Sequence, residues 1–271
     1  MSELTVRSGD GAEVRAADDG AGEVVLVLHP GFDDGSSWGR VAAGLAPRFR
    51  VLRPVRRQYR LDAVHRHPCS IADEVTDVLA LVEAVGGPVL LVGHSSGAVV
   101  ALEALVASPA SFSGAVLYEP PVHLRLGEWT AWIAQANAAL AAGRPGTAMA
   151  LFVREIVGMS SWVARLVGTL TAVVPRYRVL VPCQTADAEA INDLGVRLDA
   201  YAGITVPTVL LTGSRSPAHL RERIDALAAT MPDTQTLVLS GQGHDAQLKK
   251  PAAVVDAIEA LAARVRADRQ G

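Results

Sequence analysis

The chain has 271 residues, of which half are apolar and a fifth are charged. A chain of this length buries a full hydrophobic core, either as one domain with an insertion or as two domains. The 25 basic and 28 acidic residues give a net charge of −3, which indicates no electrostatic partner such as nucleic acid or an anionic membrane. We therefore expect a small-molecule substrate, and the oligomeric state stays open.

The start of the chain and its cysteines indicate where the protein works. The first seven residues, Met-Ser-Glu-Leu-Thr-Val-Arg, lack the basic patch and apolar run of a signal peptide. No uncharged apolar stretch reaches the roughly 18 residues that a membrane span needs. The two cysteines, Cys69 and Cys183, lie far apart without metal-type partners and are interpreted as reduced thiols. Together these features favour a cytoplasmic protein.

Apolar runs and helical patterns alternate along the chain. Six short runs rich in Val and Leu end at turn residues: 24–28, 50–55, 88–92, 114–118, 208–212 and 236–239. Their continuous apolarity predicts strands buried on both faces. Helical spacing marks four segments between them: 71–85, 98–107, 218–230 and 252–267. This alternation predicts an α/β fold with a mostly parallel sheet covered by helices on both sides.

The stretch from Leu124 to about Ala200 has helix-like segments but no clear strand. We interpret residues 122–200 as a helical cap inserted into a core formed by residues 1–121 and 201–271. Trp129 and Trp132 are three residues apart, on one helical face, and are expected to pack the cap against the core. Such a cap gives the site an apolar wall, which favours a substrate with a hydrophobic acyl or alkyl part.

A glycine-rich loop follows the first buried run. Residues 29–35 read His-Pro-Gly-Phe-Asp-Asp-Gly. The loop lies where an acyl-transfer enzyme needs a backbone N–H donor for an oxyanion, and the N–H of Phe32 is our candidate. A plain turn explains the glycines but not their position.

Residues 93–97 read Gly-His-Ser-Ser-Gly, which matches the pattern G-x-S-x-G. The motif alone is a weak signal, but here it follows a buried strand and opens a helix. The glycines suit a strained turn that lifts the hydroxyl of Ser95 above the sheet. Ser95 would then lie at a helix N-terminus, where the N–H of Ser96 can point at an oxyanion. The alternative is a Gly-Ser turn that only caps a helix.

A second glycine-rich loop follows the last strand, where residues 241–245 read Gly-Gln-Gly-His-Asp. His244 in this loop can reach over Ser95. A neutral imidazole suits removal of the serine proton and its later return to a leaving group. The alternative is a solvated histidine without a catalytic role.

The three motifs together resemble the α/β-hydrolase superfamily over nearly the whole chain. The resemblance implies an eight-stranded sheet and a helical cap after the sixth strand. It also implies esterase, lipase or thioesterase chemistry without a metal or organic cofactor. The order of a serine nucleophile, an acid and a histidine along the chain agrees with that family.

One position departs from the family pattern. Members commonly carry Gly-x-x-Asp after the penultimate strand, whereas residues 213–216 read Gly-Ser-Arg-Ser and place Ser216 at the acid position. Serine provides no charge to orient the histidine. Glu119 follows the preceding buried strand, a position from which some family members supply their acid, and is our first choice. The alternative is that Glu119 is a solvated or cap-anchoring carboxylate. Three weaker candidates for the acid are Asp33, Asp34 and Asp245.

Several other interpretations are weaker or stay open. The segment His-Arg-His-Pro-Cys at residues 65–69 resembles part of a zinc site, but no further ligand lies at a recognisable spacing. The same catalytic residues would also serve an acyltransferase, a cyclase or a lyase. The missing aspartate leaves a non-catalytic ligand-binding protein as a further alternative. The substrate itself is not predicted.

Overall fold

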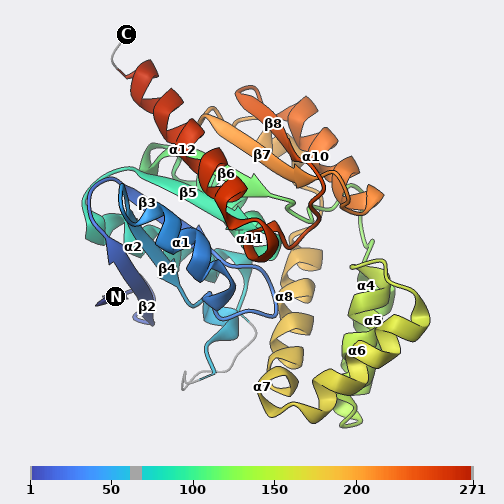
Figure 1. The fold of residues 1–271 in the computed structure, drawn as a ribbon. Coiled ribbons are helices and arrows are strands. Elements are labelled where there is room, and N and C mark those ends of the chain that lie inside the picture. Colours follow the sequence, from blue (N-terminus) through green and yellow to red (C-terminus); the bar gives the residue numbers. More distant parts are fainter. Residues whose placement is uncertain (1, 62–68, 270–271) are drawn as a thin grey trace.

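A computed structural model describes residues 2–61 and 69–269 (Figure 1). Its centre is a sheet of eight strands in the order β1-β2-β4-β3-β5-β6-β7-β8. Strand β2 pairs antiparallel with β1 and β4, and all neighbours from β4 to β8 are parallel. The strands are β1 (Ser2–Arg7), β2 (Glu13–Gly20), β3 (Val24–Leu28), β4 (Arg50–Pro54), β5 (Val89–His94), β6 (Phe112–Tyr118), β7 (Thr208–Gly213) and β8 (Thr234–Leu239). The predicted mostly parallel α/β sheet is confirmed.

Five of the six apolar runs correspond to strands that are largely buried. The run at 236–239 is the exception: only Leu239 of β8 is buried, because β8 forms an edge of the sheet. Every residue of β5, β6 and β7 is buried. The first two strands produce no such run, because they form the antiparallel edge of the sheet. In β2 only Val14 and Ala16 are buried, with more exposed residues beside them. Half-buried strands of this kind alternate in polarity, and a search for continuous apolarity misses them.

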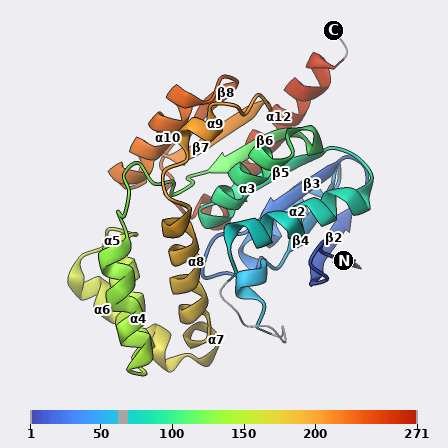
Figure 2. The ribbon, with the colours of Figure 1, turned by 180° about the vertical axis from the view of Figure 1, so that it is seen from behind.

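Helices cover both faces of the sheet. Helices α1 (Gly39–Leu45) and α12 (Pro251–Asp268) lie on one face (Figure 1). Helices α2 (Ile71–Val85), α3 (Ser96–Ala107) and α10 (Ala218–Thr230) lie on the other (Figure 2). Four short elements complete this part: η1 (Ser36–Trp38), η2 (Arg57–Tyr59), η3 (Pro109–Ser111) and α11 (Ala246–Lys249). The two faces enclose two separate apolar clusters, one on each side of the sheet.

Between β6 and β7 the chain forms helices only, and we call residues 122–200 the cap. Its helices are α4 (Thr130–Ala141), α5 (Pro145–Glu155), α6 (Ser161–Val173), α7 (Pro175–Arg178), α8 (Leu180–Leu194) and the start of α9 (Leu198–Tyr201). Helices α4, α5 and α6 stand to one side of the sheet, and α8 runs between them and the core (Figures 1 and 2). Helices α5 and α6 cross closely, since a Cβ on Gly146 would lie 2.6 Å from the carbonyl oxygen of Gly168. The apolar cluster beneath α2 and α3 continues into the cap through Trp132 and Ile191.

Candidate active site

Ser95 lies in a strained turn between β5 and α3. Its backbone has φ 53° and ψ −125°, and its N–H donates to the carbonyl oxygen of Tyr118 at 2.8 Å. The flanking glycines allow this turn. A Cβ on Gly93 would lie 2.5 Å from the Ala98 Cα, and one on Gly97 would lie 2.5 Å from the Leu28 carbonyl oxygen. Only glycine fits between these backbone segments.

Three candidate residues share an unusual backbone conformation. Among the described residues, Phe32, Ser95 and Glu119 are the non-glycine residues with positive φ, at 57°, 53° and 47°. This conformation is costly for a residue with a Cβ and tends to occur at functional sites. Each of the three follows the carboxyl end of a strand: β3, β5 and β6. Those strands are adjacent and parallel, so the three residues lie at one edge of the sheet.

Glu119 binds the ring of His244. Its Oε2 accepts a hydrogen bond from Nδ1 of His244 at 2.6 Å. Its Oε1 accepts from the hydroxyl of Thr212 at 2.7 Å and from the N–H of Gly213 at 2.9 Å. The Glu119 side chain is fully buried, whereas that of His244 is 37% exposed. Burial by itself raises the pKa of Glu119. The hydrogen bond and charge of His244, with smaller contributions from Ser216 and the Gly213 N–H, together outweigh burial and hold that pKa below its usual range.

Ser216, at the usual acid position, is buried, and its hydroxyl lies close enough to Glu119 to contribute to lowering the pKa of that carboxyl. The end of β7 also takes part in the site, because Thr212 and Gly213 bind the Glu119 carboxylate. The carboxylate therefore comes from β6, and β7 supplies hydrogen-bond donors in place of an acid.

The other acid candidates are engaged elsewhere. Asp33 accepts from the hydroxyl of Ser37 at 2.6 Å. Asp34 pairs with Arg176 at 3.1 Å, and Asp245 pairs with Lys249 at 2.7 Å. None of these three carboxylates binds His244.

His94 and Tyr118 hold the loop that carries His244. Nε2 of His94 donates to the carbonyl oxygen of His244 at 2.9 Å, and the two rings lie 4.7 Å apart between centroids. The hydroxyl of Tyr118 donates to the carbonyl oxygen of Gly243 and accepts from the N–H of Ala246. Burial holds the pKa of His94 far below its ordinary value, so the ring stays neutral. Sequence reasoning missed both residues, although His94 lies within the serine motif.

A buried charge cluster joins Ser96 to the cap. Arg56 donates to the Ser96 hydroxyl at 2.7 Å, to Glu74 of α2 at 2.5 Å, and to both oxygens of Asp187 of α8 at 2.8 and 3.2 Å. The hydroxyl of Tyr59 donates to Asp187 at 2.7 Å. Each of the three charged side chains is at most 4% exposed. Burial raises the pKa of Asp187, but the Arg56 charge and the hydrogen bonds that Asp187 accepts together outweigh burial and lower that pKa. Burial and the nearby Asp187 charge raise the pKa of Glu74.

The loop of residues 29–35 is held by contacts with Arg56 and with the cap. Beneath it, His29 accepts a hydrogen bond from the N–H of Arg56 at 2.9 Å and donates to the Pro30 carbonyl oxygen at 2.8 Å. Above it, the ring of Phe32 stacks on Tyr177 of α7 with centroids 5.8 Å apart.

The Ser95 hydroxyl makes no hydrogen bond to any described residue.

A cavity of about 470 Å³ lies between α10 and the first part of the cap. Trp129 and Trp132 line it together with the charged side chains of Glu155 and Arg223. The wall therefore combines apolar and charged side chains. Both tryptophans are buried, as expected. His219, also in the wall, is close enough to His244 for that ring to contribute to lowering its pKa, after burial and Arg223.

The segment that resembles part of a zinc site falls at residues 65–69, of which only Cys69 lies within the described residues. Within residues 2–61 and 69–269, no group of three or more His, Cys, Asp or Glu side chains is placed to hold a metal ion. No helix in the same part of the chain is long and apolar enough to cross a membrane.

Comparisons with known proteins identify the family and support the fold. The pattern of the alpha/beta hydrolase family matches residues 24–257. No curated protein matches the chain. An alpha/beta hydrolase from Sphaerobacter thermophilus is 27% identical with a TM-score of 0.77, covering 93% of this chain and 99% of that one. An esterase from Thermogutta terrifontis is 20% identical with a TM-score of 0.76, covering 98% and 99%. A thioesterase domain from the curacin biosynthetic pathway is 21% identical with a TM-score of 0.65, covering 95% and 99%. The chain belongs to the alpha/beta hydrolase family.

Proposed function

We propose that the protein is a serine hydrolase that cleaves an ester or thioester with an apolar acyl or alkyl part. Ser95 is the proposed nucleophile, His244 the base and Glu119 the acid. The esterase and the thioesterase domain among the similar structures support this class of reaction through their fold. The observation that carries the proposal is the 2.6 Å hydrogen bond between the buried Glu119 carboxylate and Nδ1 of His244.

The hydrogen bond to Glu119 selects one tautomer of His244. Because the carboxylate accepts the proton on Nδ1, the neutral ring keeps Nε2 free to accept a proton. In the first step the Ser95 oxygen attacks the substrate carbonyl carbon, and Nε2 takes the hydroxyl proton. The carbonyl π electrons move onto the oxygen, which becomes an oxyanion. The Glu119 charge then stabilises the imidazolium.

The N–H groups of Phe32 and Ser96 are the proposed donors to that oxyanion. Ser96 begins α3, where the helix dipole adds positive potential. Removing one such donor typically costs about 2.7–4 kcal/mol of transition-state stabilisation. Arg56, through its bond to the Ser96 hydroxyl, is a positioning residue for this donor.

Collapse of the oxyanion expels the leaving group, which receives the proton from His244. Water then attacks the acyl carbon while His244 takes a proton from it. The second oxyanion collapses, the bond between the acyl carbon and the Ser95 oxygen breaks, and His244 returns the proton to Ser95. The protein's own side chains supply every proton transfer in this scheme.

Intact-mass analysis after treatment with a fluorophosphonate probe tests the proposal. Wild type should gain one adduct, mapped by peptide analysis to Ser95, and Ser95→Ala should gain none. Ser240→Ala, which removes an exposed serine on the loop near His244, is the matched control and should label like wild type. Absence of an adduct on wild type would contradict the proposal and favour a ligand-binding protein. If Glu119→Gln is labelled as fast as wild type, Glu119 is not the acid that acts on His244.

A further inference from the structure

The outer surface of the cap exposes an unusual number of apolar side chains. Fourteen large apolar residues are exposed in the described part of the chain, and eight of them fall within residues 159–179. We call these eight the α6 patch: Met159, Trp162, Leu166, Leu170, Val173, Val174, Tyr177 and Val179. A contiguous exposed apolar surface on a folded domain indicates an interaction site.

Four members of the patch lie on one face of α6, and the others lie just before it or in and beside α7. Trp162, Leu166, Leu170 and Val173 are spaced by three or four residues and are 71%, 53%, 55% and 68% exposed. The opposite face packs on α5 through Ala164, Gly168 and Thr171, all of which are buried. The apolar stripe is thus not the packing face of the helix.

Charge is segregated onto the same part of the molecule. Helices α4 to α7, residues 130–178, contain five arginines and one glutamate, a net charge of +4, whereas the cap as a whole carries +1 and the complete chain −3. The net charge of the complete chain gave no indication of an anionic membrane partner, because it sums this positive region with the negative remainder. Attraction of an anionic surface depends on the local field, which is positive here.

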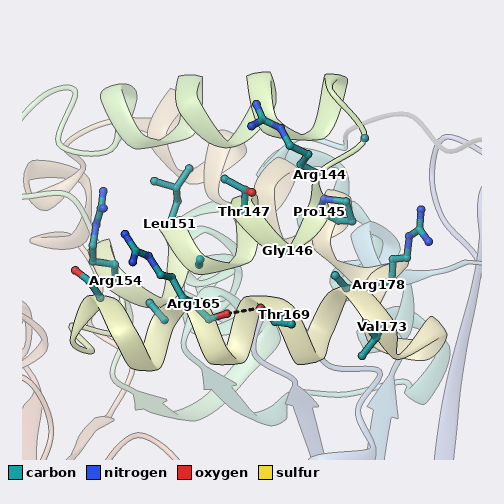
Figure 3. Close-up of a pocket in the computed structure, with 15 residues that line it drawn as sticks. Arg144, Pro145, Gly146, Thr147, Leu151, Arg154, Arg165, Thr169, Val173 and Arg178 are labelled. Carbon is teal, nitrogen blue, oxygen red and sulfur yellow. Dashed lines mark hydrogen bonds between the residues drawn. The ribbon is translucent and has the colours of Figure 1, made fainter.

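Arginines border the apolar stripe. Between α5 and α6 runs an open groove of about 710 Å³, lined by Arg144, Arg154, Arg165 and Arg178 (Figure 3). Arg154 pairs with Glu155. The guanidinium groups of the other three make no ion pair with any described residue. These groups remain able to bind phosphate oxygens.

We propose that the α6 patch and the arginines beside it bind the surface of an anionic lipid bilayer. A helix with a tryptophan and leucines on one side has the apolar face of an interfacial helix, and here Arg165 of α6 and arginines of the adjoining segments supply the basic border. The charge argues against a second copy of the chain, because a symmetric pair would bring like-charged cap surfaces together. The proposal concerns the cap surface and goes beyond the proposed function.

With the α6 patch on the bilayer, the loop of residues 29–35, which carries the proposed oxyanion donor Phe32, would lie close to the lipid. Tyr177 belongs to the α6 patch and stacks on Phe32. The neighbouring Arg176 pairs with Asp34 of the same loop at 3.1 Å. The membrane-facing surface and the candidate active site therefore share α7 as their border.

Co-sedimentation with lipid vesicles tests the proposal, using the full chain. We expect binding to vesicles of equimolar phosphatidylcholine and phosphatidylglycerol, weaker binding at high salt, and little binding to phosphatidylcholine alone. Trp162→Ser should weaken the binding by about tenfold and Arg165→Gln by about fivefold. Val238→Ser and Arg269→Gln remove an exposed apolar residue and an exposed arginine outside the cap, and should bind like wild type.

Tryptophan fluorescence provides a second measurement. Trp38, Trp129 and Trp132 are at most 7% exposed, so Trp162 is the tryptophan whose emission can respond to a lipid environment. Its emission should shift to shorter wavelength on anionic vesicles, and Trp162→Phe should remove the shift. Ser95→Ala should bind like wild type, which separates this proposal from the proposed catalysis.

Equal binding to neutral and anionic vesicles would refute the proposal. The proposal would also be refuted if the two control variants lost as much binding as Trp162→Ser and Arg165→Gln. A third outcome would also overturn the lipid assignment: no vesicle binding, together with a dimer in sedimentation experiments that Trp162→Ser dissociates. That result would identify a second copy of the chain as the occupant of the patch.

Discussion

Removal of the Asp187 carboxylate probes the buried cluster that joins cap and core. In Asp187→Ala, Arg56 loses two charge-assisted hydrogen bonds, and the Tyr59 hydroxyl loses its shorter acceptor. Removing one partner of a buried ion pair typically costs about 3–5 kcal/mol. Arg56 keeps Glu74 as a partner at 2.5 Å, and the repulsion between the two carboxylates disappears. We therefore expect the lower limit, a loss of about 3 kcal/mol in the free energy of unfolding.

Urea denaturation followed by tryptophan fluorescence measures this loss. Glu155→Gln, which breaks the exposed pair with Arg154, is the control and should cost about 0.5 kcal/mol or less. If Asp187→Ala fails to fold, Asp187→Asn keeps the shape and one acceptor oxygen and should lose a smaller amount in the same direction.

The same variant has an expected effect on catalysis under the proposed function. Arg56 loses the carboxylate that fixes its Nη1, and with it the orientation of Ser96. Because the Ser96 N–H acts on the oxyanion, kcat should fall by about tenfold while KM stays nearly constant. A stability loss no larger than that of Glu155→Gln would refute the assigned role of the cluster. A change confined to KM would refute the positioning of Ser96.

Three further predictions follow from single contacts. Glu119→Gln should lower kcat by about 10⁴-fold in an ester-hydrolysis assay, because an amide stabilises neither the tautomer nor the imidazolium, and an unchanged circular dichroism spectrum would exclude unfolding as the cause. Burial and the Arg56 charge lower the pKa of His29 from 6.5 to about 4. Only the unfolded chain binds a proton there between these values, so stability should fall by about 3 kcal/mol as pH drops from 6.5 to 4, and His29→Gln should flatten this slope in urea titrations. Gly97→Ala should cost about 3 kcal/mol or more in unfolding free energy, because its Cβ would meet the Leu28 carbonyl, whereas Gly87→Ala has open space and should cost little; equal losses would contradict the steric argument.

The elements of the core were predictable because they depend on local patterns. Continuous apolarity identified β5, since every one of its residues is buried. Helix α2 begins and ends at the predicted residues, where Ser70 and Asp73 form a capping box at its start and Gly86 has a left-handed conformation at its end. The antiparallel strands β1 and β2 left no such signal, because water covers one of their sides.

The sequence alone determined the turn at Ser95, because the spacing of Gly93 and Gly97 meets a local steric need. It did not choose between Glu119 and the other acid candidates, since that choice depends on which strand ends meet the His244 loop. Arg56 and Asp187 are 131 residues apart, and no pattern in either segment shows that they pair. Tertiary structure decided these contacts, and it also decided the exposed face of α6, because an apolar stripe has the same spacing whether it packs on a neighbouring helix or faces outward.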